Sequence, residues 1–153
     1  MKLWRKLFIV VLAFVMIFAF SSCTQEQATD KPAETPADSN KFELALITDV
    51  GTIDDKSFNQ GAWEGVEAYA KEKGITYKYY KPTEKSDAAY INSIDLAAKA
   101  GAKVIVCPGF LFEVPIHTVQ TKYPEVNFVL LDGAPHAGDY NIEIAPNTYS
   151  IFY

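Results

Sequence analysis

The sequence is poor in the residues that build metal sites and disulfides. Its 153 residues include two cysteines and two histidines, and neither pair has the close spacing of a zinc site. We therefore expect no metal and no cofactor. Cys107 is expected to be a small buried residue at the end of a strand. His117 and His136 are expected at surface or loop positions rather than as ligands.

Motifs typical of enzymes are also missing. The sequence contains no G-x-G-x-x-G, no G-x-x-x-x-G-K and no G-x-S-x-G pattern, which argues against nucleotide-dependent enzymes and serine hydrolases. A phosphoacceptor receiver domain would carry an aspartate after its third strand, where Cys107 and Pro108 stand instead. We therefore expect a protein that is not an enzyme.

An excess of basic residues is lacking as well. The 14 lysines and arginines are outnumbered by 19 aspartates and glutamates, which gives a formal net charge of -5. Without a basic cluster, nucleic acid is not an expected partner. Hydrophobic residues make up 49% of the chain, which is enough for a folded core.

The first 22 residues have the pattern of a targeting segment. Three basic residues, Lys2, Arg5 and Lys6, precede an apolar run over residues 7–20, which is shorter than the roughly 20 residues of a membrane-spanning helix. Ser21, Ser22 and Cys23 follow and resemble a bacterial lipobox, with Phe20 in place of the usual leucine. We expect residues 1–22 to be a lipoprotein signal peptide and Cys23 to carry the lipid. The alternative is an uncleaved signal anchor that starts near Leu7.

The segment after Cys23 has the composition of a linker. Residues 24–40 contain two prolines and no aromatic or large aliphatic residue, so they cannot bury enough apolar surface to offset the entropy of ordering. We expect residues 23–41 to be a lipid-anchored disordered linker. The globular body would then be residues 42–153, held at the extracytoplasmic face of the cell membrane by the lipid.

Strand and helix patterns alternate along this body. Apolar or alternating runs predict strands, and helical spacing of apolar residues predicts the helices between them. The predicted strands are 43–48, 75–80, 103–107 and 126–131, with a last β-rich segment at 148–153, and the predicted helices are 57–73, 86–100 and 113–122. This order predicts an α/β fold with a doubly wound parallel sheet and helices on both faces.

Several polar or small residues follow the predicted strands. Asp49 follows the first strand, Gly109 and Phe110 follow the third, and Asp132 follows the fourth. Because the carboxyl ends of parallel strands share one edge of a sheet, these residues should surround a common crevice. Phe58 lies at the start of the first helix, near the same edge. Two carboxylates and two aromatic rings suit a neutral polar ligand with a flat ring.

Each of these residues also has a structural alternative. Asp49 could cap its own loop by accepting hydrogen bonds from backbone amides, and Phe58 could be a core residue. Asn59 could reach a ligand or only water. Asp54 and Asp55 are expected to cap the first helix rather than to bind a ligand.

Three motifs together resemble one known family. TDVGTIDDKSFNQGAWEG at residues 48–65, the Gly109–Phe110 pair and LLDG at residues 130–133 are similar to the basic membrane protein (BMP) family. These are PnrA-like substrate-binding lipoproteins of ABC transporters, many of which bind purine nucleosides. The resemblance covers the body from Phe42 onward.

The resemblance implies a periplasmic-binding-protein type 1 fold, with a nucleoside held between two α/β lobes. It implies that Asp49 and Asp132 contact the ligand, that Phe58 stacks on the base, and that Asn59 is a further contact. The implied partners are the permease and ATPase subunits of an ABC importer.

Members of that family are longer and have a second lobe. We therefore interpret residues 42–153 as an N-terminal ligand-binding lobe, with the second lobe absent or truncated. The alternatives are a membrane-tethered regulatory lipoprotein of the same fold without a transport role, and a binding protein for another small polar ligand.

Overall fold

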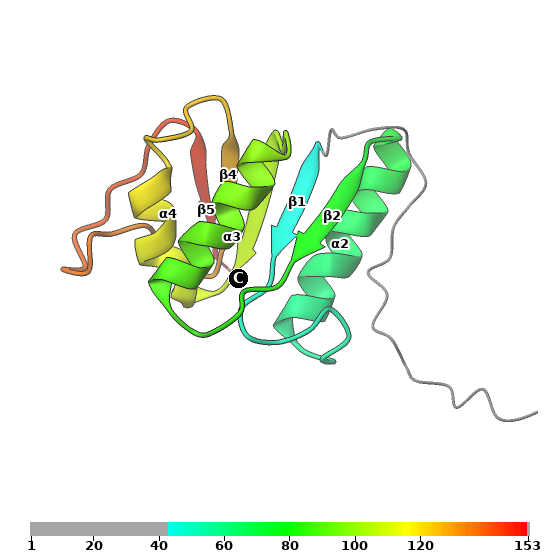
Figure 1. Cartoon of the computed structure of the whole chain (residues 1–153), viewed down its shortest axis with the longest axis horizontal. Coiled ribbons are helices and arrows are strands. Elements are labelled where there is room, and N and C mark those ends of the chain that lie inside the picture. The colour runs from blue at the N-terminus through cyan, green and yellow to red at the C-terminus, as the bar shows by residue number, and fades with distance from the viewer. Residues whose placement is uncertain (1–42, 153) are drawn as a thin grey trace, which may run out of the picture. The chain divides into compact units, whose positions relative to one another are not determined.

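The computed structural model describes residues 43–152, which form a five-stranded parallel sheet with helices on both faces (Figure 1). The predicted signal peptide, linker and lipidated Cys23 lie outside these residues. The strands are β1 (Leu44–Ile47), β2 (Tyr77–Tyr80), β3 (Val104–Pro108), β4 (Asn127–Leu131) and β5 (Thr148–Ile151). The helices are α2 (Phe58–Lys73), α3 (Asp87–Lys99) and α4 (Glu113–Val119), with a 3-10 turn η1 (Phe110–Phe112) before α4.

Most element boundaries follow the expected signals. Gly74 ends α2 in the left-handed conformation, with φ of 66°, which glycine adopts without steric cost. Ser86 caps α3 by accepting a hydrogen bond from the N–H of Ala89 at 3.2 Å. Helix α4 is shorter than predicted, because the N–H groups of Lys122 and Tyr123 both donate to the Val119 carbonyl and tighten the chain into a turn.

The two faces of the sheet carry two separate cores. On one face, α3 and α4 bury large side chains such as Tyr90, Phe112 and Phe128 against the sheet. On the other face, α2 buries Trp63 and Val66 against β1 and β3. Trp63 packs on the rings of Tyr77 and Tyr79 at centroid distances of 5.4 and 5.3 Å. The predicted doubly wound arrangement is confirmed.

The strand order is β2-β1-β3-β4-β5. The chain leaves β1 toward β2 on one side and returns to β3 on the other, so the connections diverge between β1 and β3. Loops at such a point splay apart and leave a crevice at the carboxyl ends of the strands. We call this edge of the sheet, with the loops that follow β1, β3 and β4, the carboxyl edge.

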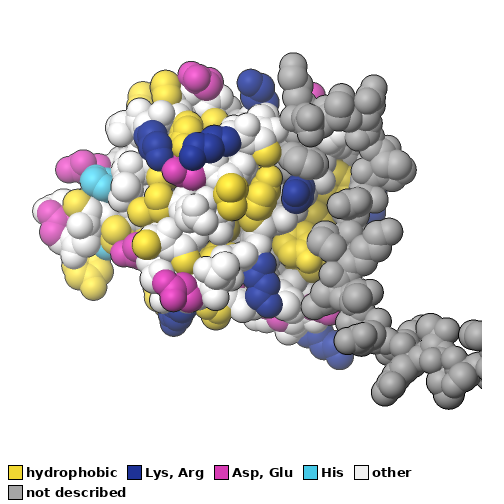
Figure 2. All heavy atoms as spheres, in the orientation of Figure 1, with side chains coloured by type: hydrophobic (Ala, Val, Ile, Leu, Met, Phe, Trp, Pro, Cys, Tyr) yellow, Lys and Arg dark blue, Asp and Glu magenta, His cyan; other side chains and the backbone are white. Residues whose placement is uncertain are grey.

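Within residues 43–152, no helix is both long and apolar enough to cross a membrane. Acidic and basic side chains are interspersed on the face shown in Figure 2. Among the charged residues, the carboxylate of Asp95 accepts hydrogen bonds from Lys122 at 2.9 and 2.8 Å.

Candidate functional site

Asp49 lies just after β1, and one of its two carboxylate oxygens is hydrogen-bonded within the protein. Its Oδ1 accepts hydrogen bonds from the N–H of Gly51 at 2.6 Å and from the side chain of Asn59 at 2.7 Å. The loop-capping alternative therefore holds for this oxygen. Within residues 43–152, Oδ2 accepts no hydrogen bond. One oxygen at the carboxyl edge is thus available to a hydroxyl or ring N–H donor.

Asn59 connects the end of β1 to the start of α2. Its side chain donates to Asp49 at 2.7 Å and to Asp55 at 2.9 Å, and its Oδ1 accepts from the N–H of Asp49 at 3.2 Å. The residue is only 4% exposed. Its polar atoms are therefore used within the protein, and Asn59 orients Asp49 in this structure.

Gly51 lies close to this hydrogen-bonded cluster. A β carbon at this position would overlap the side-chain ends of Asn59 and Asp55, so any other residue here would have to displace them. Asp55 in turn accepts hydrogen bonds from the N–H groups of Ser57 and Gln60, so it caps the start of α2 as expected. Desolvation raises the pKa of Asp55, but the hydrogen bonds from Asn59, Ser57 and Gln60 outweigh it and hold the pKa below its usual value.

Phe58 is the first residue of α2, and its ring lies beside the loop after β3. A β carbon on Gly109 would be 3.9 Å from Cδ1 and Cε1 of the ring, and 36% of Phe58 is exposed. The ring is therefore at the surface of the carboxyl edge rather than in the core. Phe110, the next residue after Gly109, is 68% exposed.

Asp132 follows β4 in the left-handed conformation, with φ of 55°. This conformation is uncommon for residues other than glycine, although aspartate tolerates it better than most. The N–H of Asp132 donates to the carbonyl of Ile151 at 2.7 Å, and the N–H of Gly109 donates to the carbonyl of Leu131 at 2.7 Å. These bonds tie the loops after β3 and β4 to neighbouring strands, and the Asp132 residue remains exposed.

The strand order sets the spacing of the two acids. Because β3 separates β1 from β4, Asp49 and Asp132 are two strands apart on the same edge, or about 10 Å between backbones. Gly109, with the ring of Phe58 against it, lies at the end of the strand between them. An aromatic surface flanked by two carboxylates can bind a ring that carries hydrogen-bond donors at both ends.

Three residues near this edge are not among the site residues predicted from the sequence. Glu113 accepts a hydrogen bond from Ala134 at 3.0 Å, and its other oxygen lies 3.2 Å from His136. His136 is in a loop as expected, but it is buried. Tyr90 is 1% exposed, and its hydroxyl has no hydrogen-bond partner among residues 43–152. Burial, and then the charges of Asp49 and Asp87, raise the pKa of Tyr90.

The sequence contains only weak signals for Glu113 and Tyr90. Glu113 is an acidic residue in the first turn of a helix, a position that usually reflects the helix dipole. Tyr90 fits the apolar stripe of its helix. Neither pattern distinguishes a residue of the site from an ordinary structural residue.

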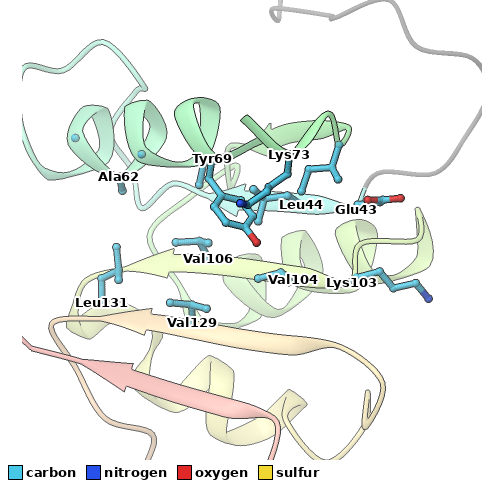
Figure 3. A pocket seen from close by; sticks show the side chains of 14 residues that line it. Glu43, Leu44, Ala62, Tyr69, Lys73, Lys103, Val104, Val106, Val129 and Leu131 are labelled. Carbon is cyan, nitrogen blue, oxygen red and sulfur yellow. The ribbon is translucent and has the colours of Figure 1, made fainter. Parts of the chain in front are cut away.

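A groove of about 710 Å³ lies on the α2 face of the sheet, apart from the two acids. Its floor is formed by Val104, Val106 and Val129, with Tyr69 and Lys73 of α2 beside it (Figure 3). Neither acid nor Phe58 lines it. The groove is mostly apolar, so it offers little to orient a polar ligand.

Sequence comparison identifies the family. Residues 42–153 match the family Bmp, described as "ABC transporter substrate-binding protein PnrA-like". The chain is 27% identical over 132 residues to the ABC transporter nucleoside-binding protein BmpA of Lactococcus lactis, a match that covers 84% of this chain and 36% of that protein. It is 35% identical over 99 residues to an uncharacterized lipoprotein of Pyrococcus abyssi, covering 65% of this chain and 24% of the relative.

A solved structure agrees with this assignment. An ABC transporter system solute-binding protein from Aeropyrum pernix superposes with a TM-score of 0.61 at 30% identity, over 71% of this chain and 28% of that chain. The chain therefore spans about a third or less of the length of these relatives. From the match over its whole body, the chain belongs to the PnrA-like family of ABC transporter substrate-binding proteins.

Proposed function

We propose that this chain is the ligand-binding lobe of a lipid-anchored substrate-binding component of an ABC importer, and that its ligand is a purine nucleoside. One observation carries the proposal: the exposed ring of Phe58 lies against Gly109, at the strand end between Asp49 and Asp132. A purine base has a flat face for stacking, and a nucleoside has ring N–H and hydroxyl donors for carboxylates. The name of the Lactococcus relative also favours a nucleoside.

In this proposal each residue has a stated role. Phe58 stacks on the base, while Oδ2 of Asp49 and the carboxylate of Asp132 accept hydrogen bonds from the base or the sugar. Asn59 orients Asp49, and Gly109 lies beside the ring. Phe110 extends the apolar surface beside it. A second lobe would close over the ligand and favour the closed state through its own contacts.

The partners follow from the same proposal. The lobe would deliver its ligand to the permease and ATPase subunits of the importer, and no catalytic step is required. A lipid at Cys23 would hold it on the extracytoplasmic face of the membrane. The word lipoprotein in the name of the Pyrococcus relative supports this anchor.

A nucleoside titration tests the ligand. Amide resonances of the isotope-labelled chain are followed as inosine, guanosine, adenosine or ribose is added to millimolar concentration. We expect the nucleosides to shift resonances at the carboxyl edge, and ribose to shift them less because it cannot stack. Phe58→Ala should weaken inosine binding about tenfold, whereas Tyr69→Ala, an exposed ring elsewhere on α2, should not. No shift with any nucleoside, or equal affinity in Phe58→Ala, contradicts the proposal.

Metabolic labelling with palmitate tests the anchor. We expect label on the wild-type protein and on Cys107→Ala, because Cys107 is buried, but none on Cys23→Ala. Label that persists in Cys23→Ala would contradict a lipid at this position.

A further inference from the structure

Glu113 begins α4, and its side chain reaches the loop that follows Asp132. Its Oε1 accepts a hydrogen bond from the N–H of Ala134 at 3.0 Å, and its Oε2 lies 3.2 Å from Nε2 of His136. A β carbon at Gly133 would come within 3.1 Å of Cγ of Glu113. The loop backbone therefore lies directly against this carboxylate, in a place where the Glu113 side chain is 23% exposed and that of His136 is 9% exposed.

The contacts of His136 define which of its nitrogens carries the proton. Its Nδ1 accepts a hydrogen bond from the N–H of Gly138 at 2.9 Å, so Nδ1 must have a free lone pair. The proton of the neutral ring is then on Nε2, which donates to Glu113. Glu113, His136 and Gly138 thus form a chain of hydrogen bonds in which every donor faces an acceptor.

This chain connects two loops of the carboxyl edge. Glu113 follows the turn η1, and its N–H donates to the carbonyl of Phe110, so its backbone belongs to the loop after β3. Its side chain holds the loop after β4 through Ala134 and His136. The carboxylate of Glu113 therefore joins the two loops that present Phe110 and Asp132, in addition to the backbone hydrogen bond from Gly109 to Leu131.

We propose that Glu113 is a positioning residue for ligand binding: it holds the Asp132 loop in register with the Gly109 loop, with His136 as its second contact. The inference rests on the proposed function, in which Asp132 accepts a hydrogen bond from the ligand. Asp132 is exposed and in a strained backbone conformation. The Asp132 carboxylate therefore points in a fixed direction only if the residues that follow it are held in place.

The structure offers a matched control. His117 and Glu143 form a second histidine–glutamate pair, with 3.0 Å between Nε2 and Oε2. There the glutamate side chain is 69% exposed. Glu143 lies later in the connection between β4 and β5, and among the described residues its carboxylate contacts His117 and none of residues 132–138. Glu143→Gln therefore makes the same chemical change without touching the contacts of Glu113 with Ala134 and His136.

Glu113→Gln tests the proposal at nearly constant size. The glutamine side chain has one acceptor oxygen, so it can satisfy Ala134 or His136 but not both. We expect amide hydrogen exchange at Ala134 or Gly138 to become about tenfold faster, with no such change in Glu143→Gln. The imidazole nitrogen shifts of wild-type His136 should show a proton on Nε2 and none on Nδ1.

The affinity for inosine gives the second measurement. Glu113→Gln should weaken binding about fivefold or more, while Glu143→Gln binds as wild type does. A role confined to stability would lower the thermal midpoint and leave the affinity of the folded protein unchanged, which would overturn the proposal. Unchanged exchange in Glu113→Gln, or the same acceleration in Glu143→Gln, would also overturn it. If wild type binds no nucleoside, the proposed function is wrong, and the exchange and nitrogen shifts alone decide the loop coupling.

Discussion

The ring of Phe58 lies beside Gly109, although the two residues belong to different strand–loop–helix units. A β carbon on Gly109 would be 3.9 Å from both Cδ1 and Cε1 of the ring, so a side chain at this position would touch the ring. The start of α2 and the end of β3 therefore meet at the carboxyl edge. This contact places an aromatic surface at the strand end that lies between the two acids.

Replacing Gly109 tests how far this loop depends on glycine. Its φ of 103° and ψ of 162° lie in a region that essentially only glycine adopts, so Gly109→Ala should destabilise the protein by about 1–3 kcal/mol. Gly61 in α2 has no atom within 4 Å of an added β carbon, and Gly61→Ala should stabilise by about 0.5–1 kcal/mol. Urea unfolding measures both. A neutral Gly109→Ala would show that the backbone conformation costs alanine little here.

Asn59→Asp tests the connection between β1 and α2. The wild-type amide donates to two carboxylates, Asp49 and Asp55, and an aspartate would place a third negative charge between them. We expect a loss of about 2–3 kcal/mol at neutral pH. The loss should shrink in acid, where protonation removes the repulsion. Thermal unfolding at several pH values measures this, and a loss independent of pH would contradict the electrostatic explanation.

Asp95 should contribute to acid sensitivity. Burial raises its pKa, but hydrogen bonds from Lys122 and Tyr123 outweigh burial, so the pKa lies below its usual value. A lowered folded-state pKa gives stability that is present above the unfolded value of about 3.9 and is lost as the pH falls through the folded value. Asp95→Asn should therefore make the thermal midpoint fall less steeply as the pH drops below about 3.9. Asp54→Asn, at an exposed position, should leave the slope as it is.

The exposed apolar side chains of β5 and of Phe152, which follows it, should promote self-association. Tyr149 is 52% exposed, Ile151 is 45% exposed and Phe152 is 62% exposed, and β5 is an edge strand of the described sheet. Such edges and patches favour association. Ile151→Lys should shift sedimentation toward monomer at high protein concentration. Leu96→Lys, at a 50% exposed residue of α3, should not, and an equal effect of both would indicate a general effect of charge.

Much of the fold could be predicted because its signals are local. Helical spacing, capping residues such as Ser86 and stop signals such as Gly74 act within a few residues of where they stand. The parallel alternation then implied that Asp49, Gly109 and Asp132 share one edge, and the structure places them there. Their contacts with a ligand remain a prediction.

The partners of individual side chains could not be predicted in the same way. Asn59 was expected to face a ligand or water, yet it is buried between Asp49 and Asp55. His136 was expected at a surface or loop position, and its loop is folded back onto Glu113. The Asn59–Asp49 and His136–Glu113 contacts join residues 10 and 23 positions apart, beyond the reach of any periodic pattern.

The sequence by itself determined the alternation of strands and helices, the parallel direction of the strands and the edge at which the polar residues gather, since each follows from spacing along the chain. Only the tertiary structure decided that β3 lies between β1 and β4, that Phe58 lies beside Gly109, and that Glu113 joins two loops. The physical reason is that strand order and loop contacts depend on how helices pack across a sheet. That packing is a sum of many weak long-range interactions, and no short segment of the chain encodes it.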